Sequence, residues 1–184
     1  TVGGQTISII GNNLFNACSG IDEARGIPIF NKYQNIKSVT ISEGIKEIES
    51  GDPNNTPTAP FLYIGLDVDE NGNGVIKHTL EVKFSDKESN TNDGSLKIIG
   101  DYSFAYNSID SISIPRSVEK IGVSSFVTFF EISSLEFEGA TDDTQTGRSL
   151  LKYIGKQAFA GADSLNNTKI TSLAIPASVT YIGD

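Results

Sequence analysis

Apolar residues along this chain recur in two short patterns that alternate with each other. In the first pattern, an aliphatic residue is followed three residues later by Ile, directly by Gly, and four residues after that by Phe. The complete copies are Ile7-Ile10-Gly11-Phe15, Leu96-Ile99-Gly100-Phe104, Val118-Ile121-Gly122-Phe126 and Leu151-Ile154-Gly155-Phe159. Two partial copies begin at Ile45 and Val179; in the first, Glu49 replaces the glycine and we expect Phe61 to replace the displaced Phe. Offsets that repeat at so many places predict a repeated structural unit.

The second pattern lies between copies of the first and consists of three apolar residues with offsets of three and two. Its copies are Ile36-Val39-Ile41, Ile109-Ile112-Ile114, Ile132-Leu135-Phe137 and Ile170-Leu173-Ile175. A fifth copy uses Leu80 and Val82, with Lys77 in the first apolar place. Alternating β-branched and apolar residues over five or six positions predict a short strand in each copy.

Each unit is therefore expected to contain a strand, a turn that often holds Pro, a second extended piece, and a tight turn or single helical turn that carries Phe. One unit cannot bury its apolar face alone, whereas stacked units place Ile on Ile and Phe on Phe in one continuous core. The repeated Gly is expected where the backbone turns with positive φ or approaches its neighbour closely. The predicted fold is a mostly β repeat solenoid of short parallel strands, one solenoid over residues 1–184 that begins and ends within a repeat.

Residues 61–84 depart from the repeat. Alternating apolar residues in FLYIGLDV and VIKHTLEVKF flank the polar stretch DENGNG, and Asn-Gly between two such runs is typical of a β-hairpin. We therefore predict a β-hairpin inserted into the solenoid over residues 61–84.

The segments ITSLAIPASVTYIG, IDSISIPRSVEKIGVSSF and LKYIGKQAFAGADSL resemble BspA-like leucine-rich repeats of bacterial surface proteins. The resemblance covers residues 96–184 well and 7–49 moderately, and residues 50–95 depart from it. It implies a right-handed leucine-rich-repeat superhelix, an extracellular or cell-surface location, and a role in adhesion or protein recognition. It implies no enzyme activity.

Composition narrows the class of partner. The chain has 14 basic residues and a net charge of −9, whereas nucleic acids and anionic membranes require clustered positive charge. No apolar run approaches the ~20 residues that span a bilayer. We therefore expect a protein or glycan partner, and neither nucleic-acid binding nor membrane insertion of this segment. The first residues lack the basic and apolar regions of a signal peptide and the chain has no Met, so we expect a processed piece of a longer protein, with signal peptide and anchor elsewhere.

Catalytic and metal motifs are scarce. Cys18 and His78 are the only residues of their kinds, which excludes an internal disulfide and zinc sites with several Cys or several His ligands. No nucleophile elbow or phosphate-binding loop is present. We therefore predict no enzyme activity and no cofactor; a hydrolase would have to use His78.

One stretch has some of the chemistry of a calcium loop. Oxygen-bearing side chains alternate in DVDENGNGVI at Asp67, Asp69, Asn71 and Asn73, as hard cations require. His78 stands at the twelfth position, where such a loop needs a bidentate Glu. The other interpretation is the tip of an Asn-Gly hairpin, and the sequence leaves both open.

The residues between the apolar positions of each predicted strand point away from the core and, once stacked, form one hydroxyl-rich face. The candidate binding residues on this face are Lys37, Ser38, Thr40, His78, Thr79, Glu81, Asp110, Ser111, Ser113, Ser133, Ser134, Glu136, Thr171 and Ser172. The stacked strands of a solenoid commonly form its docking surface, although this face lacks the Trp, Tyr and Arg of typical hot spots. The predicted function is a non-catalytic cell-surface or secreted recognition module for a protein or glycan; the alternative is a structural spacer in a longer repeat array.

Overall fold

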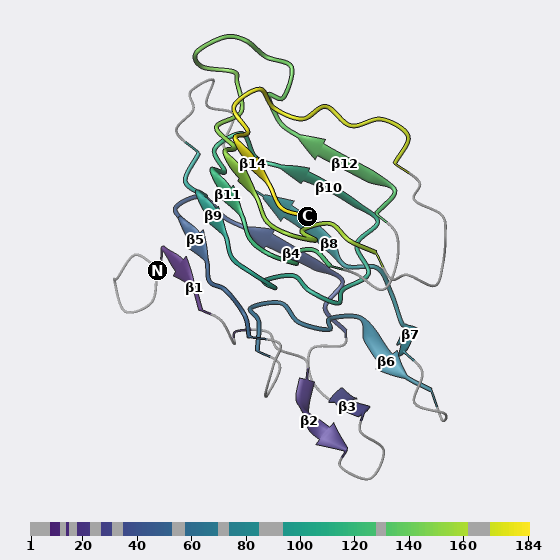
Figure 1. Cartoon of the computed structure of the whole chain (residues 1–184). Helices are drawn as coiled ribbons and strands as arrows, with labels where there is room; N and C mark the ends of the chain where they lie inside the picture. The colour runs from purple at the N-terminus through teal and green to yellow at the C-terminus, as the bar shows by residue number, and fades with distance from the viewer. Residues whose placement is uncertain are drawn as a thin grey trace.

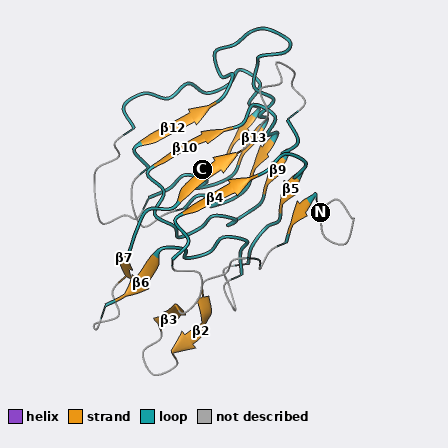
Figure 2. Ribbon diagram, turned by 180° about the vertical axis from the view of Figure 1, so that it is seen from behind, coloured by secondary structure: helices purple, strands orange, loops and turns teal. Residues whose placement is uncertain are grey.

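Strands and turns make up the described part of the chain, and it contains no helix. In this computed structural model, the described residues are 8–11, 14, 18–22, 27–30, 35–52, 58–69, 74–84, 94–127, 132–161 and 170–184. Figures 1 and 2 show two banks of strands on different sides of a stack of coils, with two hairpins projecting at one end. This arrangement confirms the predicted β-rich repeat solenoid.

One bank is a parallel six-stranded sheet of two-residue strands. The strands, in the order in which they pair, are β1 (Ile9–Ile10), β5 (Glu47–Ile48), β9 (Ile98–Ile99), β11 (Lys120–Ile121), β13 (Tyr153–Ile154) and β14 (Tyr181–Ile182). The second residue of every strand is Ile, and the register places each one directly opposite the next, from Ile10 to Ile182. The inner members are almost completely buried; Ile48, Ile99 and Ile121 are 0% exposed. These residues are the Ile of the first sequence pattern, and they stack as expected.

The other bank contains four strands of four residues each. They are β4 (Ser38–Ile41), β8 (Glu81–Phe84), β10 (Ser111–Ile114) and β12 (Ser134–Phe137). β4 pairs in parallel with β8, and β10 pairs in parallel with β12. The Leu80 N–H donates to Ser108 O (2.7 Å) and joins the two pairs, which lie side by side in Figures 1 and 2. Inward apolar and outward polar residues alternate, as the second sequence pattern predicts.

The phenylalanines form a second ladder inside the solenoid. Phe61 stacks on Phe104, Phe104 on Phe126 and Phe126 on Phe159, with ring centroids 4.7–5.3 Å apart and planes within 6° of parallel. Phe61 is eight residues from the position that the pattern would give it, yet it completes the ladder as expected. The core therefore runs continuously through all the described coils.

Polar side chains also link each coil to its neighbour. In the Pro-x-Ser-Val motif, the hydroxyls of Ser117 and Ser178 donate to the carbonyls of Leu96 and Leu151 in the preceding coil (2.9 and 2.7 Å). These bonds are buried or partly buried, so each serine satisfies a carbonyl that water does not reach. They explain why the motif keeps a serine beside its buried Val.

Asn107 is a stronger link of the same kind. Its side chain is 1% exposed; its Nδ2 donates to Phe104 O in its own coil and to Phe61 O in the coil before, and its Oδ1 accepts the Ile64 N–H (2.6 Å). An amide can do this because it carries both donors and acceptors.

The expected copy of the strand pattern around Leu80 is wrong by two residues. The register pairs Val39 with Val82 and Ile41 with Phe84, so Val82 and Phe84 are the second and third apolar positions. Leu80 lies before the strand, is 1% exposed and takes the first position that had been given to Lys77. The reason is spacing: this copy has an offset of two where the others have three, and burial of three apolar residues decides the register.

The strand expected at Ile170-Leu173-Ile175 is not formed. Residues 170–176 have no strand assignment, and Leu173 and Ile175 are 39% and 45% exposed. Because Leu173 and Ile175 are exposed, pairing here would bury less apolar surface than in a row such as that of Ile112, which is buried.

The inserted hairpin is shorter than the predicted 61–84. Antiparallel pairing is confined to β6 (Leu66–Val68) and β7 (Gly74–Ile76), while Phe61 and Phe84 both belong to the stacked coils. The two phenylalanines are drawn into the solenoid because they contact Phe104. A second antiparallel hairpin, β2 (Cys18–Asp22) with β3 (Ile27–Phe30), was not predicted.

Candidate binding surface

The outward side chains of the long strands lie in register across the strand pairs. Ser38 lies opposite Glu81 and Thr40 opposite Lys83 on the first pair, and Ser111 lies opposite Ser134 on the second. Ser113 lies opposite Glu136. The tertiary structure thus brings Ser38, Thr40, Glu81, Ser111, Ser113, Ser134 and Glu136, all predicted for this face, onto one surface, which we call the long-strand face.

Polar contacts organise this face locally. The Ser133 hydroxyl donates to Asp110 Oδ1 (2.5 Å), and the Ser113 hydroxyl donates to Glu138 Oε1 (3.3 Å). Lys83 Nζ lies 2.8 Å from Glu81 Oε1, with both side chains more than half exposed. An exposed pair of this kind adds little stability, so both groups are available to a partner.

Five predicted residues lie before the strands rather than on them. Lys37 precedes β4, His78 and Thr79 precede β8, Asp110 precedes β10, and Ser133 precedes β12. His78 lies where the β6–β7 hairpin rejoins the solenoid, next to Gly65, whose φ is +77°. Its Nδ1 lies 3.3 Å from Thr79 O. In β8 the outward residues are Glu81 and Lys83, and Lys83 was missed because the predicted register was two residues too early.

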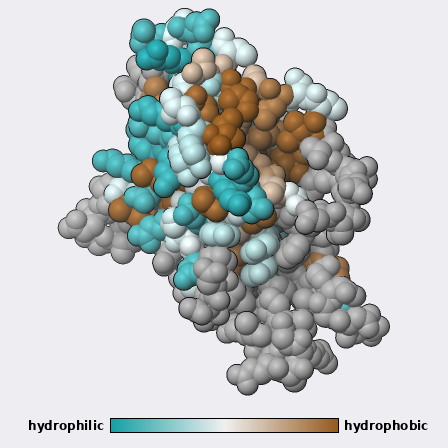
Figure 3. Space-filling model, in the orientation of Figure 1, coloured by the Kyte–Doolittle hydropathy of each residue, from teal (hydrophilic) through white to brown (hydrophobic). Residues whose placement is uncertain are grey.

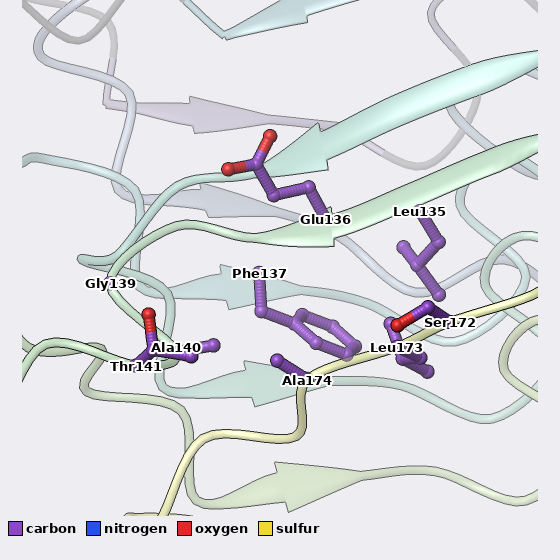
Figure 4. A pocket seen from close by; sticks show the side chains of 9 residues that line it. All are labelled: Leu135, Glu136, Phe137, Gly139, Ala140, Thr141, Ser172, Leu173 and Ala174. Carbon is purple, nitrogen blue, oxygen red and sulfur yellow. The ribbon is translucent and has the colours of Figure 1, made fainter.

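Thr171 and Ser172 are exposed but belong to the unpaired row, residues 170–176. Ser172, Leu173 and Ala174 instead form one side of a pocket of about 160 Å³ whose other side is β12. Figure 4 shows the side chains of Phe137 and Leu135 directed toward Leu173 and Ala174. The space-filling view has an apolar patch over β12 and the segment beside it (Figure 3).

A second pocket, of about 210 Å³, lies under the loop that follows β12. Asp142, Asp143 and Arg148 line it together with Ser149, which is 4% exposed. The hydroxyl and N–H of Thr144 bond Asp142 Oδ1 (2.7 and 2.8 Å) and, with the Arg116 charge, hold the pKa of Asp142 below its usual value. Asp142 is thus ionised at neutral pH and places a negative charge at this end of the face, in a pocket that Arg148 also lines.

The opposite bank carries aromatic residues that sequence reasoning missed. Tyr153 stacks on Tyr181 with centroids 4.6 Å apart, and Lys120 Nζ lies 5.6 Å from the centre of the Tyr153 ring. Desolvation, and then the neighbouring Tyr181, raise the pKa of the Tyr153 phenol. Both tyrosines directly precede the ladder Ile, which was a signal for their pairing.

The possible calcium loop falls partly outside the described residues, since Asn71 and Asn73 belong to the part not described. Of the described residues, no group of three or more His, Cys, Asp and Glu side chains is placed to hold a metal ion. None of the chain's described segments forms a helix with the length and apolar character to cross a membrane.

Comparison with protein families agrees with this geometry. The model of the BspA type leucine-rich repeat region matches residues 83–184 in six copies, which is more than half of the chain. The chain belongs to the BspA-type leucine-rich repeat family. Neither the curated proteins nor the solved structures give a significant match.

The BspA-type ladders extend beyond the matched residues. Ile48 pairs with Ile99 and Phe61 stacks on Phe104, although both partners on the N-terminal side precede residue 83. The coils before the match therefore follow the same construction with a less regular sequence. BspA-type repeats are interaction modules, typically found on bacterial surface proteins, and are not defined by catalysis.

Proposed function

We propose that this BspA-type solenoid is a non-catalytic recognition module, secreted or at the cell surface, that binds a protein or glycan through the long-strand face. The observation that carries the proposal is the register of the paired parallel strands, which places outward polar residues opposite each other in four cross-strand pairs. Strand pairing holds their backbones in place, so binding would require the ordering of short side chains only. We also propose that the chain folds as one solenoid over residues 1–184.

Chemistry on this face suits polar partners. Ser111 and Ser134 lie opposite each other, and each hydroxyl can both donate and accept. Glu81, Lys83, Asp110 and Glu136 add charges of both signs around them. Hydroxyl and carboxylate groups in such an array can match the hydroxyls of a glycan or the polar groups of a protein surface.

The test is a binding screen of the protein against extracellular-matrix proteins and a glycan array, followed by face variants. For any hit, the double substitution Ser111→Lys and Ser134→Lys should weaken binding at least about tenfold, because two cationic side chains would cover the centre of the face. Thr146→Lys is the control, since Thr146 is exposed on the loop that follows β12 and not on a strand of the face. Unchanged affinity of the double variant would reject this face.

A structural spacer is the second candidate, and the continuity of the Ile and Phe ladders favours it. A stack of coils that share one core resists bending, which suits a stalk. Binding by this segment alone, lost in the Ser111→Lys, Ser134→Lys variant, would favour recognition over a spacer role.

A further inference from the structure

The six-stranded sheet has an outer surface of its own, separate from the long-strand face. In its inner coils, the residue before each strand and the first residue of the strand are at least partly exposed, whereas the Ile that follows is buried. We call these exposed positions of β5, β9, β11 and β13 the short-strand face; they are Lys46, Glu47, Lys97, Ile98, Glu119, Lys120, Lys152 and Tyr153. Figures 1 and 2 show this sheet and the long strands on different sides of the coils.

Parallel pairing arranges the residues before these strands in a row along the stack. The Lys97 N–H donates to Lys46 O (2.8 Å), and the Glu119 N–H donates to Lys97 O (2.9 Å). The Lys152 N–H continues the row by donating to Glu119 O (3.0 Å). Neighbouring strands lie about 4.8 Å apart, so the row offers one charged side chain at each such step.

Within this row, Glu119 lies between two lysines. Its Oε1 is 3.9 Å from Lys97 Nζ, and its Oε2 is 3.5 Å from Lys152 Nζ. The side chains of Lys97, Glu119 and Lys152 are 36%, 41% and 63% exposed, so both ion pairs are weak and exchange easily with ions from solution. One carboxylate cannot neutralise two ammonium groups, so the row can accept a further anionic group.

Positive charge gathers on this face although the chain carries a net charge of −9. Four lysines and two glutamates give the face a formal charge of +2. The long strands and their directly flanking residues carry −2, from Lys37, Lys83, Glu81, Asp110, Glu136 and Glu138. Two acidic residues follow the short strands, but the Asp101 carboxylate accepts the Val123 N–H (2.8 Å) and the Glu49 carboxylate lies toward Gly11, while the exposed Lys156 adds a positive charge there. An anionic ligand therefore fits the short-strand face better than the long-strand face.

The first residues of the strands add a cation and a phenol to this row. Lys120 is the register partner of Tyr153, and its Nζ lies 5.6 Å from the centre of the Tyr153 ring. Tyr181 stacks on the same ring from the coil on the other side. With both ring faces covered, Tyr153 offers a ligand its edge and its hydroxyl, which can donate and accept hydrogen bonds.

We propose that the short-strand face binds an acidic polysaccharide, a linear glycan whose carboxylate or sulfate groups pair with Lys97, Lys120 and Lys152. A polymer with regularly repeated charges matches lysines that recur on successive coils, and sugar hydroxyls match the Tyr153 hydroxyl. Protein partners typically depend on aromatic anchors set in apolar pockets, whereas this face is mainly charged and hydroxylated, which favours a glycan. The site is separate from the long-strand face and does not depend on the proposed function.

The probes are polygalacturonate, which carries carboxylates, dextran sulfate, which carries sulfates, and neutral dextran. Binding to the whole chain is measured by isothermal titration calorimetry at about 50 and 200 mM NaCl. At least one acidic polymer should bind, and its affinity should fall about tenfold at the higher salt concentration, because exposed lysines are screened. Which polymer binds identifies the anionic group. Binding of dextran with equal affinity, or no binding of either acidic polymer at about 1 mM repeat units, would overturn the proposal.

A matched pair of double variants tests the location of the site. Lys97→Gln with Lys152→Gln should weaken binding of the acidic polymer at least about tenfold, because two of the three pairing cations are lost. Lys37→Gln with Lys83→Gln removes the same charge from the long-strand side and should leave the affinity within about twofold. Equal losses in the two double variants would show a non-specific charge effect and overturn the site.

A variant that gains affinity guards against misfolding as an explanation. Glu119→Gln should strengthen binding at least about threefold, because it removes a repelling carboxylate and releases Lys97 and Lys152 for the ligand. Glu81→Gln makes the same change at an exposed position of β8 and should have an effect within about twofold. No gain in Glu119→Gln would contradict a site centred on this row.

Other occupants of the face would give distinct results. Poly-L-glutamate that binds as tightly per charge as the acidic polysaccharide would indicate an acidic protein segment. Self-association in sedimentation velocity that the Lys97→Gln, Lys152→Gln variant abolishes would indicate the long-strand face of a second copy; either result overturns the proposal. The Ser111→Lys, Ser134→Lys variant should bind the acidic polymer within about twofold of the parent at 200 mM NaCl, so failure of this site would leave the proposed function standing.

Discussion

At the scale of single residues, the repeated glycine is required by close approach of neighbouring coils. A Cβ added at Gly100 would lie 2.5 Å from Glu49 C and Ser50 N, and at Gly122 it would overlap Asp101 N. The sequence left open whether the glycine served a positive φ or a close contact. Among the described glycines the positive φ values belong to Gly44, Gly65 and Gly139, none of which is the glycine of the repeat, so close contact is the reason.

Gly122→Ala should therefore destabilise the protein by about 1–3 kcal/mol, because backbone atoms of the coil below cannot move aside cheaply. The measurement is urea denaturation. Gly161→Ala is the control, since nothing lies within 4 Å of an added Cβ there, and its unfolding free energy should stay close to that of the parent. Equal effects of the two substitutions would contradict the packing argument.

The residue two places after the repeat glycine has a left-handed backbone. Tyr102, Ser124 and Gln157 have φ of 55°, 49° and 53°. The N–H groups of Tyr102 and Ser124 donate to Val123 O and Lys156 O of the next coil, both at 2.9 Å. The left-handed residue thus directs its N–H along the stack, where a helical turn would direct it within the coil. This is why the turns carrying Phe are not helical.

Gln157→Asn should stabilise the protein by about 0.5–1 kcal/mol. Asn tolerates the left-handed region better than Gln, and the Gln157 side chain is exposed, so little packing is lost. Thermal denaturation is a suitable measurement. Lys156→Asn, one residue earlier at an ordinary φ, should give no gain; a gain at both positions would remove backbone strain as the cause.

At the scale of elements, stability depends on the row in which a residue lies. Phe126 is 1% exposed and stacks between Phe104 and Phe159, whereas Phe159 is only partly buried. Each Phe inside the ladder contacts another Phe on both sides. A Phe at the same position of the repeat therefore contributes differently to the free energy of unfolding, depending on the coil in which it lies.

Phe126→Ala should cost about 3–5 kcal/mol, and Phe159→Ala clearly less. Urea denaturation of both variants and the parent protein measures each loss of unfolding free energy and shows which substitution costs more. If Phe159→Ala were the more destabilising change, the core would not be continuous through Phe126.

At the scale of the whole molecule, a stack of coils should open most easily at the row whose ladder residue is most exposed. The Gly122 N–H donates to Ile99 O (2.8 Å) and the Gly183 N–H to Ile154 O (2.9 Å), so these two amides have equivalent hydrogen bonds. Ile121 is 0% exposed while Ile182 is 54% exposed. Local opening of a solenoid requires only the neighbouring interfaces to break, and the interface at Ile182 buries less apolar surface.

Amide hydrogen exchange should show this gradient. The Gly183 amide should exchange at least about a hundredfold faster than the Gly122 amide, with Gly155 between them, because the neighbouring Ile182, Ile154 and Ile121 are 54%, 6% and 0% exposed. Similar rates at all three positions would indicate that the solenoid unfolds only as a whole.

The sequence by itself determined which residues form the Ile ladder. The offsets of Ile99, Ile121 and Ile154 predicted the ladder that the register shows, because each offset is local and states which side chain faces the core. Only the tertiary structure decided which rows pair. Local alternation does not specify which strands pair across loops of unequal length, so the register of Val82 and the absence of a strand at Leu173 depended on long-range burial and hydrogen bonding.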